Sequence, residues 1–194
     1  MLINEIFYSL QGEGYNSGTA AVFVRLSGCN LRCPFCDTRH ESGTEMSEEE
    51  ILAQVSSYPA NLVVITGGEP SLQLTETLVD ALHGLGRKVT VETNGTHALP
   101  PNVDWITLSP KDLFIQDKAH VVLTSVNELK VLFDGIHEPC EYSNIEVSHG
   151  RFLQPCDTGN ATENEEIVRH TVDYVKQHPE WRLSLQIHKL LNIP

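Results

Sequence analysis

Residues 61–70 read NLVVITGGEP, a continuous apolar run that ends in two glycines and a glutamate. A short apolar run rich in β-branched residues and bounded by glycine is typical of a strand buried on both faces, as in a parallel sheet. Before it, Ser47 and Glu50 have the spacing of a capping box, which predicts a helix through about residue 58. After it, leucines at every fourth position predict a second helix over residues 72–85. The stretch therefore lies inside a helix–strand–helix unit.

The same alternation extends outward in both directions. A third helix is predicted over residues 162–178, where apolar residues follow a helical stripe. Further strands are predicted over residues 21–28, 88–93, 104–109, 127–133, 151–155 and 182–187. Strands that alternate with helices indicate a parallel sheet of the α/β class. Because a complete eightfold barrel uses about 250 residues, we expect one domain, residues 1–194, that forms an incomplete TIM-like barrel of about six parallel strands.

Composition limits the classes of partner. The formal net charge is −13, which argues against a surface that neutralises the phosphates of nucleic acid. No apolar run approaches the roughly 20 residues of a membrane helix, and the N-terminus lacks the basic and apolar regions of a secretion signal. We therefore expect a cytoplasmic protein with no nucleic-acid or membrane partner, although a small anionic ligand held by one or two local cations is compatible with this charge.

The loop after the first predicted strand, CNLRCPFCDT, holds three thiols in a C-x3-C-x2-C spacing. These thiols belong to Cys29, Cys33 and Cys36. A [4Fe–4S] cluster normally takes four thiolates, so three would leave one iron open to a ligand that is not protein. His40 leaves a second interpretation open, a Cys3His zinc site in a binding module. The remaining cysteines, Cys140 and Cys156, are expected to be free thiols.

This spacing, followed by TGGEP after the next predicted strand, resembles the signature of the radical S-adenosylmethionine superfamily. The resemblance implies a [4Fe–4S] cluster whose open iron chelates the methionine part of S-adenosylmethionine. It also implies that cleavage of this cofactor supplies a 5′-deoxyadenosyl radical, which takes a hydrogen atom from the substrate. Gly68 and Glu69 would then face the methionine amino group, since glycine lets backbone approach a ligand closely. Phe35 would form an apolar wall near the cluster or the adenine.

The flanking motifs resemble those of the 7-carboxy-7-deazaguanine synthases, a family of that superfamily, from residue 3 to residue 194. They include LQGEG, FVRLSGCNLRCPFCDT, VVITGGEP, VETNGT, LSPK, FLQP and HKLLNIP. The resemblance implies the Mg²⁺-dependent ring contraction of 6-carboxy-5,6,7,8-tetrahydropterin to 7-carboxy-7-deazaguanine with loss of ammonia, on the route to queuosine. It further implies a homodimer and an electron donor such as flavodoxin. The alternative within the superfamily is an activase that makes a glycyl radical on a partner protein, which would not require LQGEG, Arg25 or HKLLNIP.

The resemblance also assigns residues. Thr38 would be a ligand of Mg²⁺, a hard cation that prefers oxygen ligands and retains water, although a turn hydroxyl is the alternative. The substrate would be bound by Leu10, Gln11, Gly12, Glu13, Arg25, Thr66 and the C-terminal Pro194. S-adenosylmethionine would be bound by Phe35, Cys36, Asp37, Gly68, Glu69, Ser109, Pro110, Lys111, Gln154, Pro155, Cys156 and Asp157. A solvated surface position is the alternative for Lys111 and for the terminal carboxylate.

Arg25 has a physical argument of its own. It lies in an apolar strand, where a guanidinium is costly unless it is paired. A carboxylate on the substrate is a fitting partner because a guanidinium can bind it through two parallel hydrogen bonds. An ion pair with an acidic residue of the protein is the alternative.

Overall fold

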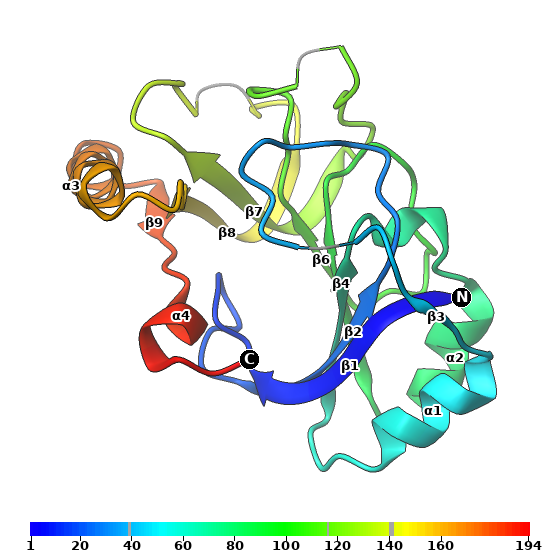
Figure 1. Ribbon diagram of the computed structural model, residues 1–194. Helices are drawn as coiled ribbons and strands as arrows, with labels where there is room; N and C mark the ends of the chain where they lie inside the picture. The colour runs from blue at the N-terminus through cyan, green and yellow to red at the C-terminus, as the bar shows by residue number, and fades with distance from the viewer. Residues whose placement is uncertain (39, 116, 140–141) are drawn as a thin grey trace.

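The computed structural model describes residues 1–38, 40–115, 117–139 and 142–194 (Figure 1). In these parts of the chain, nine strands form one sheet in the order β3-β1-β2-β4-β5-β6-β7-β8-β9. The strands are β1 Leu2–Leu10, β2 Ala20–Leu26, β3 Thr44–Glu45, β4 Leu62–Gly67, β5 Lys88–Thr93, β6 Trp105–Leu108, β7 Ser125–Phe133, β8 Glu146–Pro155 and β9 Trp181–Leu183. β1 and β3 pair in antiparallel fashion, and the other seven described strands pair in parallel. The α/β class is confirmed, with one more parallel strand than expected.

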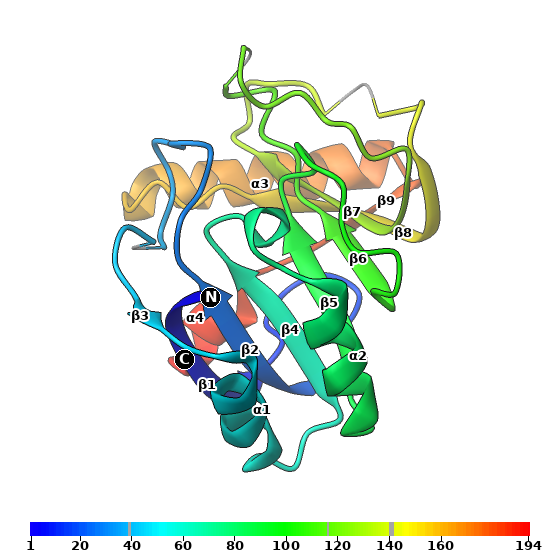
Figure 2. The same cartoon turned by 90° about the vertical axis from the view of Figure 1, so that its right-hand side faces the viewer.

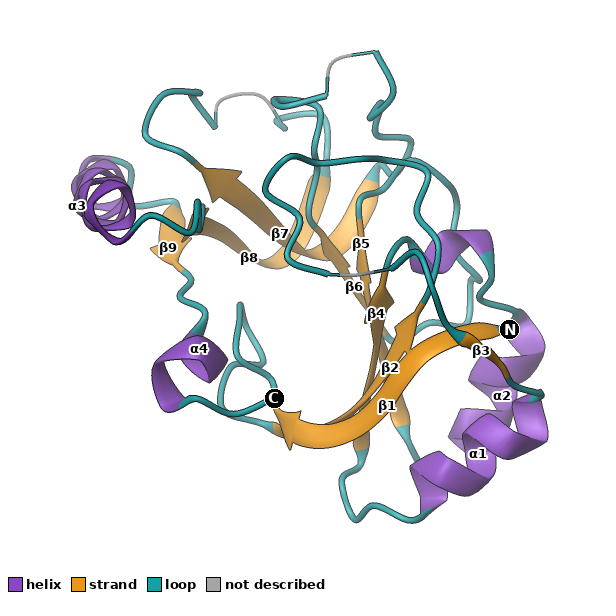
Figure 3. Cartoon of the chain, viewed as in Figure 1, coloured by secondary structure: helices purple, strands orange, loops and turns teal. Residues whose placement is uncertain are grey.

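The helices α1 Glu48–Ser56, α2 Glu76–Gly84 and α3 Ala161–Gln177 cover the outer side of this sheet (Figures 2 and 3). The 3₁₀ turn η1 Pro70–Leu72 follows β4, and the short helix α4 Ile187–Leu191 lies at the opening of the sheet. The capping box at Ser47 and Glu50 is confirmed, with both reciprocal hydrogen bonds present. The predicted helix over 72–85 begins later, at Glu76, because the Thr75 hydroxyl accepts from the Leu78 N–H and so caps it there. Residues 70–72 form a separate turn.

Two predictions for the chain ends are wrong or incomplete. The strand predicted over residues 182–187 ends at Leu183, and α4 begins at Ile187. The antiparallel strand β1 was not expected, since its apolar residues Ile3, Ile6 and Phe7 do not alternate regularly. It pairs along β2 from Ile3 to Leu10 with one irregularity, and so covers the edge that β2 would otherwise expose.

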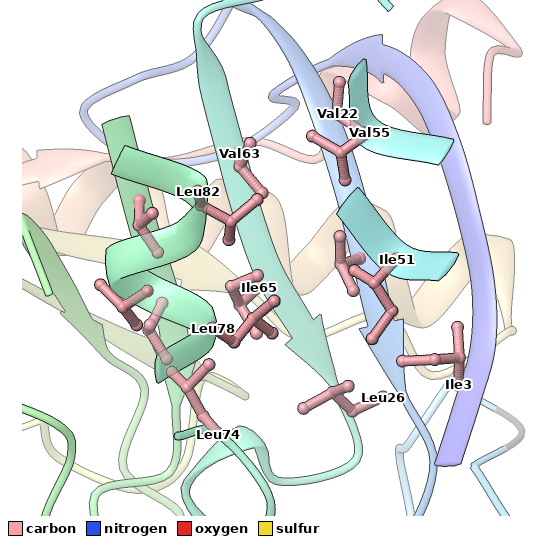
Figure 4. Close-up of a cluster of buried hydrophobic side chains, with 14 of the residues drawn as sticks. Ile3, Val22, Leu26, Ile51, Val55, Val63, Ile65, Leu74, Leu78 and Leu82 are labelled. Atoms are coloured by element: carbon pink, nitrogen blue, oxygen red, sulfur yellow. The ribbon is translucent and has the colours of Figure 1, made fainter. Parts of the chain in front are cut away.

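One apolar core lies between the sheet and the helices α1 and α2. Ile51 of α1 and Leu78 of α2 are fully buried, and Figure 4 shows them directed at the side chains of β2 and β4, including Val63 and Ile65. A second core joins β6, β7 and β8 to α3, through residues such as Leu129. A third apolar cluster lies on the other face of β2 and β4, where Phe23 and Val64 pack with Phe7 of β1 and line the larger of the two cleft lobes described below.

The sheet does not close into a barrel by strand pairing. Instead, the C-terminal segment after β9 crosses the opening and reaches the end of β1 (Figure 1). The Ile187 N–H donates to the Gly12 carbonyl at 3.0 Å, and the Ser9 hydroxyl donates to an oxygen of Pro194 at 2.7 Å. The expected incomplete barrel is therefore present, and its gap is bridged by the tail. None of the helices in the described parts of the chain is long and apolar enough to cross a bilayer.

Candidate functional site

A cleft with two lobes lies at the carboxyl ends of the parallel strands. The larger lobe has a volume of about 540 Å³ and the smaller one about 220 Å³. The loops after β2, β4, β5, β6 and β8 all contribute to the smaller lobe, which confirms the prediction that these loops meet at one rim. Residues that line both lobes are Glu13, Asp37, Thr38, Thr66, Glu92 and Gln186. The lobes are thus two parts of one continuous site.

The three thiols of the loop after β2 line the smaller lobe. Burial raises the pKa of the Cys29 and Cys33 thiols, so both would release a proton on binding iron. Among the described residues, no three His, Cys, Asp or Glu side chains converge as a single metal ion requires. Thiolates of a [4Fe–4S] cluster each bind a different iron and need not converge on one point. The donor set therefore fits a cluster held by Cys29, Cys33 and Cys36.

Glu69 of the GGE motif joins loops rather than lining the cleft. Its side chain is buried, and its carboxylate accepts from the Thr93 hydroxyl at 2.6 Å, the Asn94 N–H at 2.8 Å and the Ser71 N–H at 3.0 Å. The Asn94 amide in turn donates to Asn30 in the cysteine loop at 3.1 Å. Glu69 therefore holds together the loops around the cluster site, while its contact with S-adenosylmethionine stays a prediction.

Gly68 has a second reason to be glycine. A Cβ at this position would collide with the carbonyl of Gly28, in the loop after β2. That close approach allows the Gly68 N–H to donate to Leu26 at 2.9 Å and the Glu69 N–H to donate to Gly28 at 2.8 Å. Gly68, expected to let a ligand approach closely, also lets the backbone at Gly28 approach. The loops after β2 and β4 are therefore held together at the same rim.

Most of the other residues predicted to bind S-adenosylmethionine line the smaller lobe. These are Phe35, Cys36, Asp37, Ser109, Lys111, Gln154, Cys156 and Asp157, whereas Pro110 and Pro155 do not line it. The Lys111 ammonium donates to the carbonyl of Ser109 at 2.5 Å and to its hydroxyl at 2.6 Å, and burial lowers the pKa of Lys111. The alternative of a solvated surface lysine is therefore wrong. Cys156 is a buried free thiol as expected, and Cys140 lies outside the described residues.

All of the residues predicted to bind the substrate line the larger lobe, namely Leu10, Gln11, Gly12, Glu13, Arg25, Thr66 and Pro194. Arg25 has two partners there. Its Nε donates to Glu5 at 2.8 Å, and its Nη1 donates to the Thr38 hydroxyl at 3.4 Å. The ion pair that was the alternative for Arg25 is present, but it occupies only part of the guanidinium. Substrate binding by Arg25 stays a prediction.

Sequence reasoning missed two charged residues of this site. Glu92, at the end of β5, lines both lobes, and Lys130 of β7 lines the smaller one. The Lys130 ammonium lies 2.6 Å from a carboxylate oxygen of Glu13 and 2.8 Å from one of Glu92. The sequence could have indicated Lys130, because it lies in the apolar strand NELKVLF. A lysine in such a strand, like Arg25, is costly unless it is paired with an acidic group.

The C-terminal tail packs over the larger lobe. The Gln186 amide donates to Glu13 at 2.9 Å, and the ring of His188 packs against Gly12, where a Cβ would collide with it. Lys189 pairs with Asp157 at 2.7 Å and with Asp37 at 3.3 Å, and its hydrogen bond lowers the pKa of Asp157 to about 2. The tail is thus tied both to the cysteine loop and to the loop after β8.

Comparison with known proteins agrees with this geometry. A model of the radical SAM superfamily matches residues 23–114. A 7-carboxy-7-deazaguanine synthase from Bacteroides thetaiotaomicron is 51% identical over 191 residues, which cover 98% of this chain and 97% of that protein. The chain belongs to the 7-carboxy-7-deazaguanine synthase family. Another member, from Burkholderia multivorans, is 39% identical over 215 residues and covers 99% of this chain and 98% of its own.

A solved structure has a similar fold over nearly the whole chain. The crystal structure of QueE from Escherichia coli superposes with a TM-score of 0.74 at 29% identity, over 95% of this chain and 93% of that chain. Membership of the radical SAM superfamily brings with it a [4Fe–4S] cluster and S-adenosylmethionine. Because the match to the synthases runs over almost the whole chain, it sets aside both the zinc-binding module and the glycyl-radical activase.

Proposed function

We propose that this chain converts 6-carboxy-5,6,7,8-tetrahydropterin to 7-carboxy-7-deazaguanine, with loss of ammonia and with a requirement for Mg²⁺, for use in queuosine or related 7-deazapurine synthesis. The observation that carries the proposal is the two-lobed cleft. Its smaller lobe holds the three thiols, its larger lobe holds Arg25, and the two share Thr38. A cofactor and a carboxylate-bearing substrate bound in adjoining lobes would meet beside the Thr38 hydroxyl.

The residues of the larger lobe suit a substrate with one carboxylate and one polar heterocycle. Arg25 supplies a guanidinium beside Thr38, and two charge-assisted hydrogen bonds from it would orient the substrate carboxylate. The Thr38 hydroxyl and the Asp37 carboxylate are oxygen donors, the type that Mg²⁺ prefers alongside water and a substrate oxygen. In the same lobe, Glu13 and Gln11 offer groups that can hydrogen-bond a pterin edge.

The smaller lobe suits the cluster and S-adenosylmethionine, which when bound supply the radical chemistry that starts by removing a hydrogen atom from the substrate. Lys111 and Ser109 line this lobe with fixed donors, since Lys111 is held by Ser109. Phe35 packs edge to face on Phe114, with ring centroids 4.7 Å apart, and contributes an apolar surface to the lobe.

The experiment is a product assay under anaerobic conditions. The reconstituted protein is incubated with a reductant, S-adenosylmethionine, Mg²⁺ and 6-carboxytetrahydropterin, and 7-carboxy-7-deazaguanine and ammonia are measured. We expect equal amounts of both products, and less of each when Mg²⁺ is removed by a chelator. Cleavage of S-adenosylmethionine without deazaguanine would refute the substrate assignment. A colourless protein that holds zinc in place of iron would refute the cluster.

Further features are inferred from the family resemblance together with the structure. We infer a homodimer, an electron donor such as flavodoxin, a cytoplasmic location, and no nucleic-acid or membrane partner. The net charge of −13 supports the exclusion of nucleic acid. One sheet that runs from β3 to β9 supports a single domain over residues 1–194.

A further inference from the structure

Lys130 lies at the bottom of the cleft, behind two carboxylates. Its side chain is only 6% exposed, whereas the side chains of Glu13 and Glu92 are 17% and 19% exposed. Its ammonium contacts one oxygen of each glutamate, at 2.6 and 2.8 Å. The two carboxylates come from different parts of the sheet, the loop after β1 and the end of β5, and the ammonium of Lys130 on β7 bridges them. Without the ammonium, two partly buried negative charges would face each other.

The second oxygen of each carboxylate is oriented by an amide. Gln186 donates to Oε1 of Glu13 at 2.9 Å, and Gln11 donates to Oε1 of Glu92 at 3.2 Å. Both glutamates line the cleft, and a carboxylate can accept about four hydrogen bonds in total. Each carboxylate can therefore still accept hydrogen bonds from a bound ligand. Its orientation is fixed by Lys130 at one oxygen and by an amide at the other.

Other titratable groups face this cluster. They are Glu128 on β7, Lys111 in the loop after β6 and His188 on α4. Burial opposes the charge on Lys130, but Glu13, Glu92 and Glu128 together raise its pKa. Burial would likewise raise the pKa of Glu13, but the charge and hydrogen bond of Lys130 lower it to about 2. Burial and Glu92 raise the pKa of Glu128 to about 7.

We propose that Lys130 is a positioning residue, which orients Glu13 and Glu92 as a pair of acceptors for the amino and ring N–H groups of the substrate heterocycle. The inference rests on the proposed function. An acceptor pair favours a pterin, whose 2-amino group is a donor, over a lumazine, which has an oxygen at that position. A site whose buried polar groups are left unpaired, or meet a like group, rejects such an analogue strongly.

The test compares the binding of 6-carboxypterin and 6-carboxylumazine by the anaerobic holoenzyme in the presence of S-adenosylmethionine. The wild-type protein should prefer the pterin by about tenfold or more. In Lys130→Met, which keeps most of the side-chain length but removes the charge, pterin affinity should fall by about tenfold or more and the preference should disappear. Lys176→Met, at an exposed position of α3, should change neither quantity.

The pH profile separates positioning from simple packing. Without Lys130, only the hydrogen bond from Gln186 and the charge of His188 oppose the effect of burial on Glu13, so the pKa of Glu13 should rise well above about 2. Pterin binding by Lys130→Met should then weaken as the pH falls from about 8 to about 5, whereas the contribution of Glu13 in the wild type stays constant over that range. If Lys130→Met does not fold, Lys130→Arg keeps the charge and both carboxylates but replaces the single ammonium by a planar fork, and it is measured for the same preference.

An unchanged preference and an unchanged pH profile in the variants would overturn the role of Lys130. Absence of pterin binding by the wild-type protein would instead overturn the proposed function itself. The two failures are distinguished because the first leaves wild-type binding intact.

Discussion

Replacing Arg25 by lysine tests how the cleft recognises a carboxylate. In the structure, Nε of Arg25 is taken by Glu5 at 2.8 Å, and Nη1 reaches the Thr38 hydroxyl at 3.4 Å. Arg25 lines the larger lobe. A lysine has one ammonium instead of a planar fork, so it can pair with Glu5 or with the substrate but cannot present two parallel hydrogen bonds to either.

The expected loss follows from these contacts. One charge-assisted hydrogen bond contributes about 1.5–3 kcal/mol, which corresponds to about 10- to 150-fold in Kd. The Arg25 side chain is 24% exposed, so water offsets part of that loss. We therefore expect Arg25→Lys to weaken substrate binding by about 10- to 30-fold. Binding of S-adenosylmethionine should change much less, because Arg25 does not line the smaller lobe.

The measurement is equilibrium binding of 6-carboxypterin and of S-adenosylmethionine to the anaerobic holoenzyme with Mg²⁺. Arg32→Lys is the matched control, since the Arg32 side chain is 92% exposed and lies outside both lobes. Equal losses of affinity for the two ligands in Arg25→Lys would refute the assignment of Arg25 to the substrate. They would indicate instead that the Arg25–Glu5 pair only stabilises the rim.

Three further predictions concern the cluster, the core and the tail. Cys33→Ala should lose both iron and turnover, measured by iron analysis and product assay, since two thiolates do not hold the cluster. Leu78→Ala should lower the free energy of unfolding in urea by about 2–5 kcal/mol, because Leu78 is fully buried between α2 and the sheet. Lys189→Met should raise the pKa of Asp157 from about 2. The substitution should lower the free energy of unfolding by less than about 1 kcal/mol above about pH 4, and this difference should vanish as the pH falls toward 2.

The cluster and core predictions each have a control variant, and all three have a contrary result. Cys156→Ala should retain the cluster, and full turnover by Cys33→Ala would rule out the three-thiol site. Leu190→Ala, with 73% of Leu190 exposed, should change stability by less than about 0.5 kcal/mol, and an equal effect in Leu78→Ala would contradict the described core. For the tail, the pKa of Asp157 is lowered in the folded state, so its pair with Lys189 stabilises the protein only where Asp157 is ionised. A loss of stability in Lys189→Met that grew as the pH fell would contradict this prediction.

Much of the site was predictable because its residues lie in loops that directly follow predicted parallel strands. The carboxyl ends of parallel strands meet at one edge, so the cysteine loop, TGGEP and SPK had to lie near one another once the strands were recognised. The helix that begins after Ser47 was equally local, since a capping box needs only four consecutive residues. Residues 182–187 were misjudged because β propensity continued past Leu183, whereas the Ile187 N–H is taken by Gly12 rather than by a strand.

The sequence by itself determined the periodic elements, the spacing of the three thiols and the loops that carry them, since these depend on neighbours within a few residues. Only the tertiary structure decided that Lys130 lies between Glu13 and Glu92, that Glu69 faces the loop after β5, and that the tail bridges the open barrel. The physical reason is the same in each case. A buried charge or an unpaired hydrogen-bonding group has to find its partner wherever the packing of distant segments brings one.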